Sequence, residues 1–308
     1  MTDFPSLSWR EGAPAPLPRA GCAAGVVGGH VVIAGGTFWQ EGQKHWCAQA
    51  DAYNPATNRW QALPPLPQPR GDAPTVVVED VLYILGGGVD GPPVDTVVRF
   101  AGGSWSQAPD LALPSPRRSS AAAVVDDTIF LLGGLAGTWT DFGSATSTVW
   151  SARPGAGTWS SRRPMPGPAR FNAAVGAVGD RVLVAGGCSA ADGKVVNLDD
   201  ILAYEPRTDQ WSTLGQLPLP LRGACGLADV DRLLVIGGYT DHFLTGLLAV
   251  NAATGAVTTA GDLPVGLADT RFLRVGRHLV GVTGEDGIKR RFPGTLLATA
   301  SVPSPRAP

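Results

Sequence analysis

Short apolar runs recur along this chain, and each of them ends on a glycine-containing pair. Runs of four to six apolar residues bounded by Gly, Asp and Pro are typical of β-strands, and no window shows a sustained helical period. The pairs are Gly35-Gly36, Gly86-Gly87, Gly133-Gly134, Gly186-Gly187, Gly237-Gly238 and Thr283-Gly284. The pattern therefore predicts an all-β protein built from six similar units.

The spacing of these pairs indicates how the units are arranged. Their first residues lie 51, 47, 53, 51 and 46 positions apart, a period typical of a radially repeated β-unit rather than of a helical solenoid. In the second unit we expect four antiparallel strands, over 73–78, 81–85, 95–100 and around Trp105. The blade cores are predicted at about 19–62, 70–107, 117–161, 170–213, 222–259 and 268–300.

The two ends of the repeat array predict how the ring closes. The segment around Trp9 matches a fourth strand with no unit before it, and the sixth unit runs out after 295–300. We expect residues 6–11 to complete the last blade, which would leave no unpaired sheet edge there. The prediction is a single propeller domain over residues 1–302, followed by a C-terminal tail at 303–308.

A second signature recurs in most units, an aromatic residue followed by a turn and a tryptophan, as in Tyr53 to Trp60 and Tyr204 to Trp211. Aromatic residues that recur once per blade usually pack between neighbouring blades, which favours a structural role for them. The combination of Gly-Gly, a following aromatic and a Trp resembles the kelch repeat over essentially the whole chain. The resemblance implies a six-bladed kelch-type β-propeller with four-stranded antiparallel blades.

An arginine lies fifteen or sixteen residues before each of the first five glycine pairs, whereas the sixth unit has Leu267 or Ala268 there. We expect these arginines to form a cationic ring around the axis, on the face where the loops after the glycine pairs open. Such a ring would bind a carboxylate through bidentate hydrogen bonds, and some members are expected to pair with Asp72 or Asp269. The alternative is that they hydrogen-bond loop carbonyls. The five residues are Arg19, Arg70, Arg117, Arg170 and Arg222.

The loops after the glycine pairs are rich in aromatic and polar side chains. Loops on a rigid scaffold often hold binding residues, and aromatics beside hydrogen-bonding groups suit a sugar or another flat, hydroxylated ligand. Packing of each aromatic within its own loop is the alternative. The candidate binding residues are Phe38, Trp39, Lys44, Trp46, Trp139, Tyr239 and His242.

The sixth unit carries an acid where the other five have none. Glu285 follows Thr283-Gly284, and Arg291 comes six residues later. This Gly-Glu…Arg element resembles that of the sialic acid mutarotase (N-acetylneuraminate epimerase) family of six-bladed kelch proteins. The segment 35–46 resembles another loop of its cyclically permuted branch, in which the Gly-Glu blade comes last. The resemblance implies that Glu285 and Arg291 are catalytic.

The resemblance further implies an isomerase that interconverts the anomers of an acidic sugar of the sialic acid class. Opening the hemiketal ring needs a base for the anomeric hydroxyl and an acid for the ring oxygen. Burial would raise the pKa of Glu285 towards neutrality and Arg291 would lower it. We expect no metal or redox cofactor. Exported members of the family carry a signal peptide that this sequence lacks, and the loops here are shorter.

Two other readings of the same features remain. The first is a non-catalytic kelch propeller that binds an acidic peptide or protein partner in an arginine-lined mouth. The second is an oxidase-type kelch propeller with copper, which is disfavoured because no constellation of Tyr, His and Cys is apparent among four tyrosines and four histidines.

Composition excludes several partners. A formal net charge of -2 and the lack of Lys/Arg runs disfavour nucleic acid. Four cysteines, Cys22, Cys47, Cys188 and Cys225, show no CxxC spacing, which argues against a zinc site. No segment approaches the roughly 20 apolar residues that span a bilayer, and the first residues do not resemble a signal peptide. We expect a soluble, cytoplasmic protein.

Overall fold

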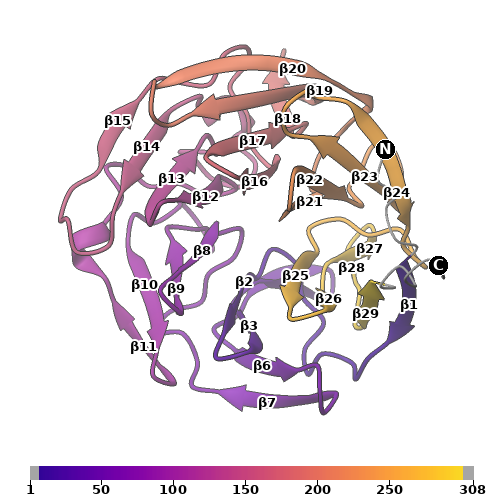
Figure 1. Cartoon of the computed structure of the whole chain (residues 1–308). Coiled ribbons are helices and arrows are strands. Elements are labelled where there is room, and N and C mark those ends of the chain that lie inside the picture. Colours follow the sequence, from indigo (N-terminus) through magenta and orange to yellow (C-terminus); the bar gives the residue numbers. More distant parts are fainter. Residues whose placement is uncertain (1–6, 301–308) are drawn as a thin grey trace, which may run out of the picture.

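The computed structural model describes residues 7–300, which form six antiparallel sheets around one axis (Figure 1). Each sheet forms one blade, and the strand that begins the blade lies nearest the axis. Blades one to three comprise β2 (Ala23–Val27), β3 (His30–Ala34), β6 (Ala50–Asn54) and β7 (Arg59–Leu63); β8 (Thr75–Val78), β9 (Val81–Leu85), β10 (Val97–Ala101) and β11 (Ser104–Gln107); and β12 (Ala121–Val125), β13 (Thr128–Leu132), β14 (Val149–Ala152) and β15 (Ser160–Arg162).

The other three blades follow the same order, and the fourth carries one additional strand. They comprise β16 (Ala174–Val178), β17 (Arg181–Ala185), β19 (Lys194–Glu205) and β20 (Gln210–Leu221), with β18 (Cys188–Ala191) against the start of β19; β21 (Cys225–Asp229), β22 (Arg232–Ile236), β23 (Gly246–Asn251) and β24 (Val257–Asp262); and β25 (Arg271–Val275), β26 (His278–Val282), β29 (Thr295–Ala300) and β1 (Leu7–Glu11). The predicted six-bladed kelch-type propeller is confirmed.

The ring closes with one strand from each end of the described chain. β1 pairs antiparallel with β29, from Leu7 opposite Ala300 to Glu11 opposite Leu296, and Figure 1 shows the two strands side by side. The prediction that an N-terminal strand completes the last blade is confirmed for residues 7–11. Residue 6 and the tail predicted at 303–308 lie outside the described residues.

The glycine pairs join neighbouring blades through the backbone. Gly35 and Gly36 have φ of 64° and 98°, in the left-handed region that favours glycine. The Gly36 N–H donates to the Arg70 carbonyl of the next blade at 2.7 Å, and a Cβ on Gly35 would collide with that same oxygen. The repeat therefore uses glycine here because the backbones of adjacent blades touch.

The repeated tryptophans also join blades, as their spacing predicts. Trp60, Trp105, Trp159 and Trp211 each donate an indole N–H to a backbone carbonyl that lies 41 to 48 residues earlier, at 2.8 to 3.0 Å. Apolar side chains fill the rest of each interface. One such cluster joins Ala23 and Ala34 of blade one to Ile84 and Val98 of blade two.

A ring of backbone hydrogen bonds surrounds the axis at the start of the innermost strands. One residue of each blade has φ between 49° and 66° and lies two positions after the repeat arginine, or after Leu267 in blade six; in blade five it directly follows Arg222. Five of them donate their N–H to the carbonyl of the preceding member at 2.7 to 3.0 Å. We call Gly21, Asp72, Ser119, Asn172, Gly223 and Asp269 the axial ring.

Two short hairpins stand beside the axial ring on the face where the loops after the glycine pairs open. They are β4 (Thr37–Gln40) with β5 (Gln43–Trp46), and β27 (Glu285–Gly287) with β28 (Arg290–Arg291). Two 3₁₀ turns, η1 (Pro109–Leu111) and η2 (Phe142–Ser144), complete the described elements. Within residues 7–300, no helix has the length and hydrophobicity that a membrane crossing requires.

Candidate active site at the propeller mouth

A pocket of about 400 Å³ opens at the mouth of the propeller, between the loops of blades one, three, five and six. The axial ring residues Asn172, Gly223 and Asp269 form part of its lining, and the two hairpins and the loop with Trp139 surround it. A volume of this size lies within the usual range of small-molecule sites, about 300–1,000 Å³. This mouth pocket is the candidate functional site.

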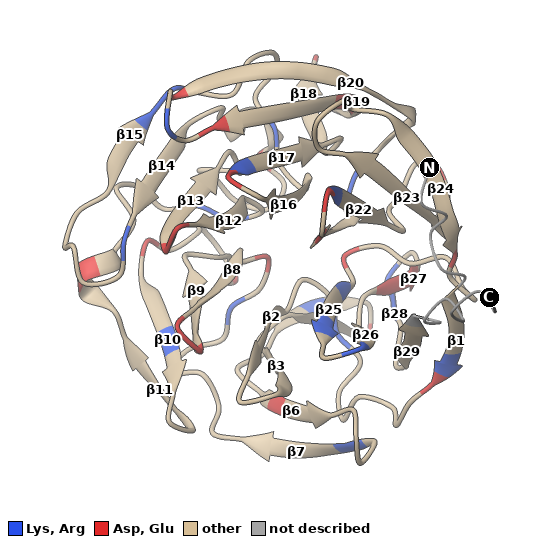
Figure 2. Cartoon of the chain, viewed as in Figure 1, with Lys and Arg blue, Asp and Glu red and all other residues tan. Residues whose placement is uncertain are grey.

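Glu285 is fixed in the mouth pocket through its own backbone. It begins β27 directly after Gly284, and its N–H and carbonyl exchange two hydrogen bonds with Ala268, at 2.7 and 2.9 Å. Arg291 is its partner across the hairpin of β27 and β28, where Figure 2 shows acidic and basic segments together. The six-residue spacing seen in the sequence is therefore the spacing of a cross-strand pair.

The Arg291 guanidinium holds the Glu285 carboxylate in place. Its Nη1 lies 2.6 Å from Glu285 Oε1, as an ion pair rather than an aligned hydrogen bond. Blade one holds the other side of the guanidinium, because Nε donates to the Thr37 carbonyl at 3.0 Å and Nη2 to Thr37 Oγ1 at 3.3 Å. Arg291 is buried and Glu285 is 26% exposed, so the carboxylate faces the pocket while its partner is anchored behind it.

The surroundings of Glu285 bring its proton affinity close to neutrality. Burial is the largest cause, and together with the negative charge of Asp269 it raises the pKa of Glu285 from 4.5 to about 7. Arg291 and Lys44 act in the opposite direction. Both protonation states of this carboxyl are therefore populated near neutral pH, as a group that both takes and gives a proton requires.

Cations stacked on aromatic rings surround the pocket. Lys44, on β5, places its Nζ 4.8 Å from the centroid of the Trp139 ring and 5.3 Å from that of Trp46. The same Nζ lies 3.9 Å from Asp72 Oδ2. The first hairpin thus reaches across the short loop of blade two to the loop of blade three.

Two more such pairs complete the rim. The Arg222 guanidinium carbon lies 4.7 Å from the Tyr239 ring centroid, and Lys289 Nζ lies 4.8 Å from that of Trp39. Arg222 also donates to Asn197 Oδ1 at 2.6 Å. Stacking orients these cations, and all four of the stacked residues line the pocket. An anionic ligand would meet positive charge and flat apolar surface together.

The predicted cationic ring is wrong for four of its five arginines. Arg19 and Arg170 are buried and pair with Asp51 and Asp200, each at 2.6 Å. Their guanidinium groups reach back into their own blades, where a carboxylate offsets the cost of burial. Arg222 alone of the five lines the mouth pocket.

Arg70 and Arg117 are held without a carboxylate. Arg70 donates to the carbonyls of Gly86 and Thr96 at 3.0 Å. Arg117 donates to the Pro116 carbonyl and stacks 4.6 Å from the Trp150 centroid. The alternative of loop hydrogen bonding therefore holds for these two.

The two aspartates of the axial ring do not pair with the repeat arginines, contrary to the prediction for some of them. Asp72 accepts a hydrogen bond at 2.6 Å from Arg118, the residue after the repeat arginine, and has Lys44 on its other side. Asp269 accepts no hydrogen bond from a side chain within residues 7–300. Arg118 was missed because the arginine that recurs in this unit is its neighbour, Arg117, so the repeat pattern does not single out Arg118.

The predicted loop residues divide into two groups. Trp39, Lys44, Trp139 and Tyr239 line the mouth pocket, with Glu285, Arg291 and Arg222. Phe38, Trp46 and His242 do not line it. Phe38 stacks on His45 at a centroid distance of 5.3 Å, Trp46 supports Lys44, and His242 is exposed and lies 2.6 Å from Asp241.

Several lining residues were missed from the sequence. Asn172 and Asp269 occupy equivalent axial ring positions, so the recurrence of polar residues two positions after the repeat arginine was the available signal. Phe243 and Lys289 lie in loops whose path the repeat pattern does not specify.

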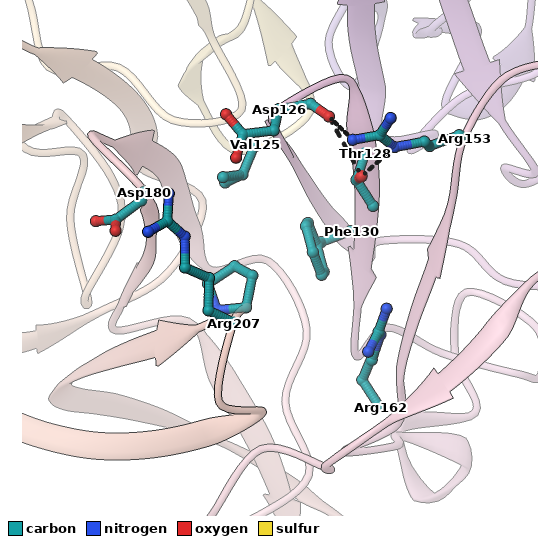
Figure 3. Close-up of a pocket in the computed structure, with 9 residues that line it drawn as sticks. Val125, Asp126, Thr128, Phe130, Arg153, Arg162, Asp180 and Arg207 are labelled. Atoms are coloured by element: carbon teal, nitrogen blue, oxygen red, sulfur yellow. Dashed lines mark hydrogen bonds between the residues drawn. The ribbon is translucent and has the colours of Figure 1, made fainter.

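A smaller cavity of about 160 Å³ lies on the opposite face, between blades three and four. Figure 3 shows Phe130 between Arg153, Arg162 and Arg207 at this cavity. Arg153 is already engaged, because it donates to Thr128 Oγ1 at 2.9 Å and to the Asp126 carbonyl at 2.6 Å. The mouth pocket is larger and joins more loops, and it is the better candidate.

The cysteines have structural surroundings. Cys22, Cys188 and Cys225 are buried, Cys47 is half-buried, and all four are free thiols. Among the described residues, no group of three or more His, Cys, Asp or Glu side chains is arranged to hold a metal ion.

Blade architecture, glycine pairs and inter-blade tryptophans together define the class: the protein is a six-bladed kelch-type β-propeller. Residues 18–67 and 169–218 match the Kelch motif. The solved structure of YjhT superposes with a TM-score of 0.76 at 16% identity, over 94% of this chain and 97% of that one, so the two share their fold.

Two curated proteins to which the chain is similar are kelch-like proteins. The chain is 29% identical to Kelch-like protein terF of Aspergillus terreus over 251 residues, which cover 75% of this chain and 52% of that protein. It is 26% identical to Kelch-like protein 35 of Mus musculus over 218 residues, which cover 70% of this chain and 35% of that protein. The chain thus spans about half, or less, of the length of these curated relatives.

Proposed function

We propose that this protein is a mutarotase or epimerase-like isomerase that interconverts the anomers of an acidic sugar. The observation that carries the proposal is the Glu285 carboxyl, which faces the mouth pocket, pairs with anchored Arg291 and has a pKa of about 7. The resemblance of the Gly-Glu…Arg element to the sialic acid mutarotase family supports the same reaction and suggests sialic acid as the sugar.

The reaction requires two proton transfers and the reversible cleavage of one ring bond. A base takes the anomeric hydroxyl proton, and the electron pair of that O–H bond forms a carbonyl. The bond between the anomeric carbon and the ring oxygen breaks, and the ring oxygen takes a proton from an acid. Reclosure on the other face of the carbonyl gives the other anomer. A carboxyl with a pKa near 7 exchanges protons in both directions without a large energetic penalty.

The pocket lining supports an acidic sugar as the ligand. Lys44, Arg222 and Lys289 provide positive charge around the opening, and each of them is stacked on an aromatic ring. A carboxylate forms strong charge-assisted hydrogen bonds with such groups, whereas the aromatic faces suit the apolar face of a sugar ring.

A second candidate function is non-catalytic binding of an acidic peptide or protein partner in the same mouth. The same rim cations favour it, and so does the exposure of Trp139 (40%) and Ile288 (80%) at the pocket. The two functions differ in their need for Glu285, because binding to rim cations does not require a proton-exchanging carboxyl.

Anomer exchange measured by NMR tests the proposal. N-acetylneuraminic acid serves as the acidic sugar and glucose as the neutral control, each with and without protein. We expect accelerated exchange for the acidic sugar, and a loss of roughly 10²–10⁴-fold in the acceleration for Glu285→Gln, the usual weight of acid–base assistance. Glu11→Gln, which removes an exposed carboxylate of β1, is the matched control and should keep the rate.

The affinity of the Glu285→Gln variant for the sugar separates the two candidates. Calorimetric titration should give binding similar to that of the parent, because glutamine keeps the size and hydrogen-bonding capacity of the side chain. Arg291→Ala should weaken both binding and rate. A parent that accelerates no exchange but binds acidic peptides would favour the second candidate.

A further inference from the structure

Asp269 is the axial ring residue of blade six, and the fold places its carboxyl at the bottom of the mouth pocket. Its φ of 49° and the hydrogen bond from its N–H to the Gly223 carbonyl, at 2.8 Å, fix its backbone. Its Oδ1 would lie 3.0 Å from a Cβ on Gly223, so the carboxyl leans over a position where the chain has no side chain. Asp269 lines both the mouth pocket and the narrow axial neck beneath it.

The backbone brings Asp269 and Glu285 together. Ala268, the residue before Asp269, is the one that exchanges two hydrogen bonds with Glu285. The two carboxyl groups line one pocket from adjacent segments, and within residues 7–300 no other blade has an acid at both of these positions. The other acidic member of the axial ring, Asp72, is instead neutralised by Arg118 at 2.6 Å and by Lys44 at 3.9 Å.

The charged groups around this pair are of both signs. Asp72, Lys44 and Arg291 act on both carboxyl groups, and Arg271, at the start of β25, acts on Asp269. Burial, followed by the charge of Asp72, raises the pKa of Asp269 in spite of the three cations. Within the described residues, Asp269 has no hydrogen bond from a side chain that would hold it as a carboxylate. Two interacting carboxyl groups lose their protons in two coupled steps, so one member of such a pair holds a proton while the other is ionised.

We propose that Asp269 is the second proton-exchanging residue of the mouth pocket and that it acts with Glu285 as an acid–base pair. This inference rests on the proposed function and adds a residue to it. The pair carries one proton. The member without the proton takes that of the anomeric hydroxyl, and the member with it protonates the ring oxygen as the ring bond breaks.

The pair therefore holds one proton before and after ring opening. Reclosure runs the same two transfers in reverse on the other face of the carbonyl, so no water or outside buffer has to enter the pocket. This division of labour gives a role to the acid that stands next to Glu285, at a position that glycine, serine and asparagine occupy in four of the other blades.

Asp269→Asn tests the inference. Asparagine is among the residues that tolerate positive φ and already occupies this position in blade four, as Asn172, so the variant should fold. Ser119→Asn is the matched control, because it alters the axial ring in blade three, on the far side of the axis from blade six. Anomer exchange of N-acetylneuraminic acid is measured from pH 4.5 to 9, with sugar affinity measured in parallel.

We expect a bell-shaped pH dependence for the parent and for Ser119→Asn, because the rate requires one protonated and one ionised member. Asp269→Asn should bind the sugar, lose roughly 10²–10⁴-fold in rate, and lose the bell shape. A lower rate with an unchanged bell would mean that Asp269 is structural, and would overturn the inference.

The possible failures are distinguishable. If Asp269→Asn exchanges as fast as the parent while Glu285→Gln does not, the inference fails and the proposed function stands. If the parent exchanges no acidic sugar, both fail together.

Discussion

Replacing Glu285 with glutamine should change how the stability of this protein depends on pH. The folded protein holds the pKa of this carboxyl at about 7, whereas its ordinary value is 4.5. Between these two values the folded state binds more protons at this site than the unfolded state does, so this site makes the parent less stable as the pH rises from 4.5 to 7. Glutamine does not titrate and removes this dependence.

The pKa difference sets the size of the effect. A rise from 4.5 to about 7, at about 1.36 kcal/mol per pH unit, corresponds to roughly 3 kcal/mol. The Glu285 side chain is 26% exposed to the pocket, and solvent there reduces the effect, so we expect roughly 1–3 kcal/mol. The attraction between Arg291 and the ionised carboxylate is not a separate contribution, because it already lowers the pKa of Glu285 and is included in the value of about 7.

Urea unfolding of the parent and the Glu285→Gln variant at pH 4.5 and pH 8 measures the effect. When the pH rises from 4.5 to 8, the free energy of unfolding of the variant should increase by roughly 1–3 kcal/mol relative to that of the parent. Glu11→Gln, an exposed substitution on β1, should gain no more than about 0.5 kcal/mol. If the free energies of unfolding of the parent and of Glu285→Gln differ by the same amount at both pH values, the pKa of Glu285 is not raised towards neutrality. That result would refute the reasoning on which the proposed site rests.

Two further predictions concern the scaffold. Deleting residues 1–12 removes β1, which pairs with β29 and places the Trp9 ring centroid 5.8 Å from that of Phe272. The deletion should lower the free energy of unfolding by roughly 3 kcal/mol or more. A denaturant midpoint equal to that of the full chain would disprove ring closure by this strand. Arg170→Met should cost roughly 2–4 kcal/mol, because it leaves Asp200, whose side chain is 27% exposed, without its buried partner. Arg59→Ala on the exposed edge of β7 should cost less than about 0.5 kcal/mol, and equal midpoints for the two variants in chemical denaturation would return Arg170 to the ligand-binding candidates.

Local repetition made the fold predictable from the sequence. Each blade has to satisfy the same conditions, which are apolar strands, left-handed glycine pairs where backbones touch, and tryptophans that bond to the preceding blade. Six repetitions of these conditions leave little freedom in the architecture. Even the closing strand followed from counting, because a fourth strand was missing at one end and surplus at the other.

The repeat pattern was a poorer guide to the site, and the arginines illustrate why. Arg19 and Arg170 lie sixteen residues before their glycine pairs and are buried against Asp51 and Asp200, whereas Arg222 lies fifteen residues before its pair and lines the pocket. The offset of one residue separates them, because the backbone of Arg222 pairs with Tyr239 as that of Arg118 pairs with Leu135, so Arg222 occupies the position after that of the buried arginines.

By itself, the sequence determined the six blades, the closure of the ring, the face on which the variable loops gather, and Glu285 with Arg291 as the exception to the symmetry. Only the tertiary structure decided which side chains share the pocket. Lys44 meets Trp139 across an intervening blade, and Asp269 meets Glu285 through a hydrogen-bonded neighbour. The reason is physical: strand formation follows from local periodicity, whereas burial, pKa and pairing depend on groups brought together by the closure of the whole ring.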